Sequence, residues 1–264
     1  MSHGQNTMDT LHGPDGGEAD RRKLVAAAAE RNQASILDVI MPHLHRQRVE
    51  RVERAGGRVD VLEVASGTGQ HAFAIARALS EQPIESVSTE TPGPVTVVIH
   101  PSDLPSEDGF NSIRAYAADH RRRHQKEGIA VAMEDPIALD CSSDDMVREA
   151  RTGAGVDHFN LIMCVNMTHI APIQATEGLI ASSGELLQAG GALAIYGPFK
   201  THQGRFTTPS NESFDASLRA RNPQWGYRSL ALLDKLCEDA GLRLETRLDM
   251  PANNFMSIYI KDAT

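Results

Sequence analysis

A carboxylate followed by closely spaced small residues is the pattern in this sequence that most directly suggests chemistry. The carboxylate is Glu63, and alternate positions after it hold Ala65, Gly67 and Gly69. Glycine accepts positive φ angles and, without a Cβ, lets the backbone approach a ligand closely. An apolar run precedes this pattern and a helical spacing of apolar residues follows it. The sequence therefore predicts the first strand–turn–helix unit of a nucleotide-binding α/β sheet.

The glycine spacing fits two kinds of cofactor. Written as Gly67-x-Gly69-x-x-Ala72, it matches the dinucleotide fingerprint, in which a pyrophosphate lies on the helix N-terminus. Written from Glu63, it resembles motif I of class I S-adenosyl-L-methionine (SAM) methyltransferases, in which the acidic residue lies close to the methionine part of the cofactor. A carboxylate suits a sulfonium and an ammonium better than a pyrophosphate, so the charge favours SAM. Ala65 stands where the broad superfamily commonly has glycine, and alanine is the smallest replacement.

Composition limits the classes of partner. The net charge of −9 over 264 residues argues against a phosphate-backbone partner. The basic cluster 121–126 fits a solvated last helical turn better than a polyanion site. The 3 cysteines show no spacing for zinc or for a disulfide framework, which predicts reduced thiols and a cytoplasmic protein with no metal. We find no signal peptide and no membrane-spanning run in the sequence.

Strands alternate with helices along most of the chain. Residues 1–20 are polar and predict a disordered or loosely attached tail, and residues 21–264 predict a single domain. A helical pattern from 23 to about 54 contains a polar interruption at 30–33. It is either an exposed turn or a junction between helices, or else a place where Arg31 or Asn32 turns inward over the cofactor pocket. Further strands are expected at 95–99, 129–132, 159–165 and 192–196, with helices at 111–123 and 176–189, the latter stopped by Gly190-Gly191. A surface loop is expected at 82–94.

The end of the chain departs from this alternation. Two strands, 242–248 and 255–260, are separated by only the short segment 249–254. So short a connection cannot make a parallel crossover, so the two strands should form an antiparallel hairpin. A terminal hairpin on a mostly parallel sheet resembles the class I methyltransferase fold, and we expect that Rossmann-like α/β fold with seven strands and helices on both faces. Residues 199–227 form a long insertion expected to cover the open end of the sheet as a substrate lid.

Several ordered motifs extend the resemblance from a superfamily to a family. They are Arg31-Asn32, Leu62 to His71, Pro101-Ser102-Asp103, Asn166 to Ile170, Tyr196 to Phe199, Ser210-Asn211 with Phe214-Asp215, and Asp249 to Asn254. Together they resemble the family of methyltransferase-like protein 26, catalogued in bacteria as a domain of unknown function, over roughly residues 25–262. The resemblance implies a class I SAM-dependent methyltransferase and no particular substrate. Within that family alanine is the expected residue at position 65.

The candidate cofactor-binding residues follow the ends of successive strands, where ligands bind in open α/β sheets. Gly67 and Gly69 should pass under the methionine part, with Glu63 and Ala65 beside it. Asp103 is a candidate for binding the ribose hydroxyls, or else caps a helix. Asp140 is a candidate for the adenine amino group, because folds that resemble this one use an acidic residue there, or else it forms a turn. Asn166 is a candidate for the amino-acid end of the cofactor or a substrate group, and Arg31 for the SAM carboxylate or an acidic substrate.

The catalytic and substrate-binding candidates lie on the acceptor side. His169 is a candidate general base for a hydroxyl, thiol or amine, or else a hydrogen-bonded structural histidine. Tyr196 either orients a substrate or lies at the edge of the core. The candidates for the substrate wall are Asn32, His71, Phe199, Asn211 and Trp225.

These features predict an enzyme that moves a methyl group from SAM to an O, N or S atom of a small molecule, leaving S-adenosyl-L-homocysteine (SAH). We expect neither a nucleic-acid nor a membrane partner, and the sequence does not define an oligomeric state. Two alternatives stay open, an NAD(P)-dependent oxidoreductase and a catalytically silent methyltransferase fold that acts as a scaffold. A methyltransferase would bind SAH, an oxidoreductase would bind NADH, and a scaffold would bind neither ligand.

Overall fold

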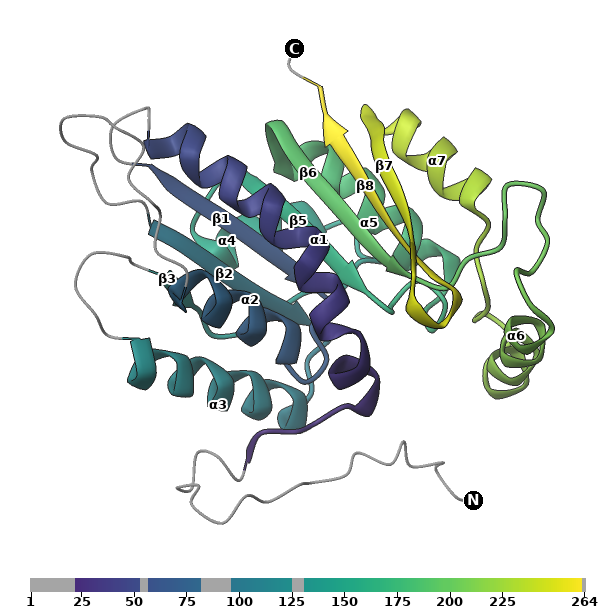
Figure 1. Cartoon of the computed structure of the whole chain (residues 1–264), viewed down its shortest axis with the longest axis horizontal. Helices are drawn as coiled ribbons and strands as arrows, with labels where there is room; N and C mark the ends of the chain where they lie inside the picture. The colour runs from purple at the N-terminus through teal and green to yellow at the C-terminus, as the bar shows by residue number, and fades with distance from the viewer. Residues whose placement is uncertain (1–21, 53–56, 82–95, 125–130, 263–264) are drawn as a thin grey trace.

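A single mixed sheet organises the computed structural model, which describes residues 22–52, 57–81, 96–124 and 131–262 (Figure 1). The predicted tail 1–20 and loop 82–94 lie outside the described residues. The sheet has eight strands in the order β3-β2-β1-β5-β6-β8-β7, with β4 paired to β2. The strands are β1 Arg58–Val64, β2 Thr96–Asp103, β3 Val131–Met133, β4 Ile137–Ala138, β5 Phe159–Val165, β6 Leu187–Gly197, β7 Leu242–Met250 and β8 Asn254–Lys261.

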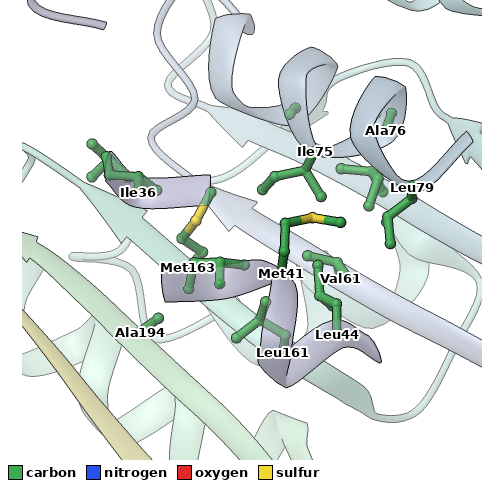
Figure 2. Close-up of a cluster of buried hydrophobic side chains, with 14 of the residues drawn as sticks. Ile36, Met41, Leu44, Val61, Ile75, Ala76, Leu79, Leu161, Met163 and Ala194 are labelled. Atoms are coloured by element: carbon green, nitrogen blue, oxygen red, sulfur yellow. The ribbon is translucent and has the colours of Figure 1, made fainter. Parts of the chain in front are cut away.

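Helices cover both faces of this sheet. They are α1 Ala27–Val52, α2 Gln70–Glu81, α3 Glu107–His124, α4 Met146–Ala154, α5 Ile173–Leu186, α6 Pro209–Arg221 and α7 Leu230–Asp239. Side chains of α1, α2 and α3 share one buried apolar cluster with the sheet, and those of α4, α5 and α7 share the other. Figure 2 shows part of the first cluster, where Met41 and Leu44 of α1 lie near Val61 and Leu161 of the strands. None of the described helices is long and apolar enough to cross a membrane.

The central strands are buried on both faces, as parallel strands between two helical layers must be. β1 pairs in parallel with β2 and β5, and β5 pairs in parallel with β6. β8 pairs antiparallel with both β6 and β7. The mostly parallel sheet and the C-terminal antiparallel hairpin of the class I methyltransferase fold are therefore confirmed. The eighth strand, β4, has two residues that pair with the end of β2.

The prediction of a helix reaching Ala189 and stopped by Gly190-Gly191 is wrong. Helix α5 ends at Leu186, and both glycines lie inside β6. Gly190 has a φ of 75°, and a Cβ on Gly191 would lie 2.9 to 3.2 Å from backbone oxygens of Gln188, Phe159 and Asn160. The register between β5 and β6 also shifts here. The glycines therefore serve an irregular strand pairing and do not end a helix.

Helix α1 runs without a break through the polar stretch 30–33, which is therefore a turn of one helix and not a junction between two. Arg31 is exposed, whereas Asn32 is buried against the sheet. Helices α4 and α7 were not predicted from the sequence. Helix α6 lies beyond the carboxyl end of β6, within the segment 199–227 (Figure 1).

Candidate active site

The loop between β1 and α2 has a left-handed backbone at three alternating positions. The φ angles are 58° at Ala65, 57° at Gly67 and 87° at Gly69. A Cβ on Gly67 would meet no atom within 4 Å, whereas one on Gly69 would lie 3.0 Å from Cγ1 of Ile113 on α3. Gly67 thus leaves its backbone open toward a ligand, and Gly69 allows the loop to pack on α3.

Asp103, the last residue of β2, fixes this loop. Its Oδ2 accepts a hydrogen bond of 2.6 Å from the backbone N–H of Gly67, and its Oδ1 accepts one of 2.7 Å from the N–H of Leu104. Burial raises the pKa of the Asp103 carboxyl, and these two hydrogen bonds oppose that rise. The carboxylate therefore joins the ends of β1 and β2, and Asp103 also lines the cavity described next.

A cavity of about 470 Å³ opens over the carboxyl ends of β1, β2 and β5. This volume lies within the range of roughly 300–1,000 Å³ found for small-molecule sites. Six of the sequence-predicted site residues line it: Ala65, Gly67, His71, Asp103, Asp140 and Asn166. Sequence reasoning missed the apolar part of the wall, which includes Leu104, Leu139, Met167, Ile170 and Ala175. For Leu104 and Leu139, the available signal was their position beside the predicted acids Asp103 and Asp140.

Glu63 lies behind this wall, on the face of the sheet covered by α1 and α2. Its side chain is 1% exposed, and its Oε2 has no hydrogen-bond partner among the described residues. Burial raises the pKa of Glu63 to about 8. A neutral carboxyl group is therefore favoured at neutral pH unless a cation comes near.

His71 and Asn32 continue a polar chain from Glu63. His71 Nδ1 lies 3.8 Å from Oε1 of Glu63, and its Nε2 lies 2.9 Å from Oδ1 of Asn32. Burial lowers the pKa of His71 to about 4, so the imidazole is neutral. Burial raises the pKa of the Tyr196 hydroxyl, and the nearby side chains of Asn32 and Asn254 oppose that rise. The chain links α1, α2 and β6 behind the cavity.

His169 occupies a second polar position, in the loop after β5. It is 6% exposed, and its Nδ1 has no hydrogen-bond partner in the described part of the chain. Burial lowers the pKa of His169 to about 4, with a smaller contribution from the charge of Arg228. The imidazole is thus neutral and can accept a proton.

Aromatic rings from the segment 199–227 surround this histidine. The ring centroids of Phe214 and Tyr227 lie 6.2 and 6.1 Å from that of His169. The backbone N–H of Gly226 donates to the carbonyl oxygen of His169 at 3.0 Å. Asp215 accepts from the N–H of Tyr227, which attaches this turn to α6. The segment thus covers the loop that carries His169.

Several sequence-predicted residues lie away from the cavity wall. Arg31 points outward from α1, and Phe199 is fully buried in the core cluster of α5 and α7. Asn211 stabilises the first turn of α6 through hydrogen bonds with Thr208 and Thr207. Trp225 is half-buried, with the guanidinium carbon of Arg221 5.9 Å from its ring. Within the described ranges, no group of three or more His, Cys, Asp or Glu residues could hold a metal ion.

Solved structures of methyltransferases resemble this fold. An O-methyltransferase family protein from Burkholderia thailandensis has a TM-score of 0.53 at 16% identity, over 93% of this chain and 61% of its own. Human N-acetylserotonin methyltransferase, solved in complex with SAM, has a TM-score of 0.51 at 10% identity, over 93% of this chain and 57% of its own.

A protein described as a pericyclic reaction enzyme scores 0.51 at 13% identity, over 78% of this chain and 44% of its own. This chain therefore spans between 44% and 61% of the length of these three relatives. At such identities the likeness shows the methyltransferase fold and leaves the reaction open.

A family model provides a match of a different kind, because it extends over nearly all of the described residues. It matches residues 23–261 and is described as "Protein of unknown function (DUF938)". The chain therefore belongs to the DUF938 family.

Proposed function

We propose that this protein is a SAM-dependent methyltransferase that acts on a small molecule. The observation that carries the proposal is the cavity of about 470 Å³ over the hydrogen-bonded pair of Gly67 and Asp103. The cavity lies at the carboxyl ends of parallel strands, where open α/β sheets bind ligands. The resemblance to the methyltransferase-like protein 26 family, which rests on the sequence motifs, supports the same proposal.

The residues around the cavity fit the cofactor's chemistry. The open backbone of Gly67 admits the methionine part, and the exposed carboxylate of Asp140 on the cavity wall suits an amino group. Glu63, buried with an unpartnered oxygen, would gain an electrostatic partner from the cofactor's cationic groups. Bound SAM would supply an electrophilic methyl group on a sulfonium sulfur. Transfer of that methyl group does not require a metal ion.

The remaining residues would orient and deprotonate the acceptor. His169 is neutral and unpartnered at Nδ1, so it can take the proton of an attacking group. Tyr196, whose hydroxyl interacts with the side chain of Asn32, would hold the rear wall of the site in position. Alignment of acceptor, methyl carbon and sulfur should supply much of the rate, because the sulfonium is already reactive.

The partner and compartment follow from charge and cysteine usage. A net charge of −9 supports a small-molecule acceptor over a nucleic acid. The three cysteines are buried and free, which supports a reducing, cytoplasmic setting. We propose no membrane partner and no resident metal.

Calorimetric titration of the purified protein with SAH tests the proposal, with NADH in parallel. We expect micromolar binding of SAH, as for a typical cofactor site, and no heat with NADH. Asp103→Ala should weaken SAH binding, whereas Asp135→Ala, an exposed carboxylate outside the cavity wall, should leave it unchanged. A folded protein that binds NADH and not SAH would support the oxidoreductase instead, and binding of neither would support the scaffold.

A further inference from the structure

Gly197, the last residue of β6, lies between two polar side chains that come from the loop after β5. A Cβ built on Gly197 would lie 3.6 Å from Nδ1 of His169 and 3.8 Å from Oδ1 of Asn166. The same point is 3.8 Å from the Phe199 ring. One small group placed beside Gly197 can therefore reach both polar atoms, and any side chain at this position would fill the space.

One of the two polar atoms that meet here, Nδ1 of His169, has no hydrogen-bond partner among the described residues, and the histidine is only 6% exposed. Leaving such an atom unpaired in the protein interior costs free energy. A ligand that supplied a hydrogen bond would recover this cost, so the orphaned nitrogen points to a binding position.

Asn166 connects this position to the cofactor cavity. Its backbone has a left-handed φ of 60°, and its N–H donates to the carbonyl oxygen of Tyr196 at 2.9 Å. Because Asn166 also lines the 470 Å³ cavity, the point beside Gly197 and the proposed cofactor site share one wall. A group seated at Gly197 would thus contact Asn166 from the side of His169, although Gly197 and His169 do not themselves line the cavity.

The surroundings indicate the kind of group that would sit there. Phe214 and Ile170 are 41% and 43% exposed, and Phe214 packs near the His169 ring. These two exposed apolar side chains would contact an apolar part of a ligand held beside His169. The charge of Arg228, whose Nη2 donates to the carbonyl oxygen of Ala171, acts on His169 and favours an oxygen that becomes negative.

We propose that Gly197 keeps open the seat for the hydroxyl group of an aromatic methyl acceptor, between Nδ1 of His169 and Oδ1 of Asn166. This inference rests on the proposed methyltransferase function. In the step it serves, the acceptor oxygen forms a bond to the methyl carbon, and the bond from that carbon to sulfur breaks with its electron pair on sulfur. The hydroxyl proton passes to Nδ1 of His169 and then to solvent.

The test uses 2-naphthol as the probe and 2-methoxynaphthalene as the matched ligand without a hydroxyl proton. Each is titrated into SAH-saturated protein carrying isotope-labelled histidine, and the ring signal of His169 is followed by NMR. We expect 2-naphthol to shift the His169 signal. We expect 2-methoxynaphthalene to bind about tenfold more weakly than 2-naphthol, because it cannot donate the hydrogen bond from a hydroxyl group.

Gly197→Ala is the decisive variant, because its nearest contacts of 3.6 Å and more are ordinary van der Waals distances and the fold should tolerate it. This variant should weaken the binding of 2-naphthol about tenfold and leave the affinity for SAH unchanged. His169→Gln identifies the signal and should also weaken 2-naphthol, whereas His202→Gln, on an exposed histidine, should not.

The outcomes separate the two proposals. Failure of the wild-type protein to bind SAH would overturn the proposed function itself. SAH binding without a 2-naphthol shift at His169, or an equal 2-naphthol affinity in Gly197→Ala, would overturn the hydroxyl seat alone. Equal binding of the two naphthalene probes would do the same.

Discussion

The backbone N–H of Gly67 and the carboxylate of Asp103 form a 2.6 Å hydrogen bond that ties the turn after β1 to the end of β2. The second carboxylate oxygen accepts from the N–H of Leu104. One side chain thereby holds two strand-end loops that border the same cavity. A ligand in that cavity would meet a loop that is already ordered, which reduces the entropy cost of binding.

Removal of this carboxylate should make the loop less ordered and weaken the binding of SAH. We expect Asp103→Ala to lower the free energy of unfolding by about 1–3 kcal/mol, because two backbone donors lose their acceptor. SAH affinity should fall by about tenfold or more. Asp103→Asn, which keeps one acceptor oxygen, should fall between the wild type and Asp103→Ala in both measurements. Urea unfolding and calorimetry check these values, and an Asp103→Ala protein with wild-type SAH affinity would contradict the role given to the carboxylate.

Local sequence patterns were sufficient to predict most strands and the hairpin, although β2 extends past its predicted end at Ile99 to Asp103. β5 was predicted with its observed bounds. The short predicted connection 249–254 required an antiparallel hairpin, and β7 and β8 do pair antiparallel. Gly67 and Asp103 could be placed near each other because parallel neighbouring strands end at the same edge of a sheet.

Features that depend on packing between distant elements could not be predicted. Whether Arg31 or Asn32 would turn inward depends on how α1 packs against α2. The residue types alone did not indicate which of the two side chains would be buried. The pair Gly190-Gly191 carries a strong helix-stop signal, and a shifted register against β5 overrides it. The space beside Gly197 depends on side chains of the β5–α5 loop and had no signal in the sequence.

The left-handed backbone at Ala65 predicts a stabilising substitution. A non-glycine residue at a φ of 58° is strained by roughly 1–2 kcal/mol, while glycine loses about 0.5–1 kcal/mol more conformational entropy on folding. Ala65→Gly should therefore raise the free energy of unfolding by about 0.5 kcal/mol. Ala118→Gly, in the helical backbone of α3, should instead lower it by about 1 kcal/mol. Chemical denaturation of the three proteins checks the contrast, and a loss of stability in both variants would show that Ala65 is unstrained.

The burial of Glu63 predicts a loss of stability as the pH rises. Its pKa of about 8 in the folded protein lies above the ordinary value of 4.5. Between these two values the unfolded chain releases a proton that the folded protein keeps, so rising pH favours unfolding by up to about 1.4 kcal/mol per pH unit. The effect is absent below about pH 4.5 and complete above about pH 8.

Glu63→Gln removes this titration and keeps the shape of the side chain. The difference in unfolding free energy between Glu63→Gln and the wild type should therefore grow in favour of the variant from pH 5 to pH 8. Glu134→Gln, on an exposed side chain, serves as the control and should show no such trend. Parallel curves for Glu63→Gln and the wild type would mean that the buried carboxyl is ionised in both states.

His169 predicts the opposite slope in a more acidic range. Its pKa of about 4 in the folded protein lies below the ordinary value of 6.5. Between those values the unfolded chain binds a proton that the folded protein does not, so stability is complete above about pH 6.5 and falls as the pH drops toward 4. From pH 6.5 to pH 5 the wild type should lose about 2 kcal/mol relative to His169→Gln.

Urea unfolding of the wild type, His169→Gln and His202→Gln at pH 5, 6 and 7 measures this difference. His202→Gln should keep the pH response of His169, because the wild-type imidazole at 169 stays buried in that variant. The result also bears on catalysis, since only an imidazole that is neutral at physiological pH can accept the acceptor's proton. A wild-type curve parallel to that of His169→Gln would mean that folding does not lower the pKa of His169, and it would contradict the buried, neutral imidazole described here.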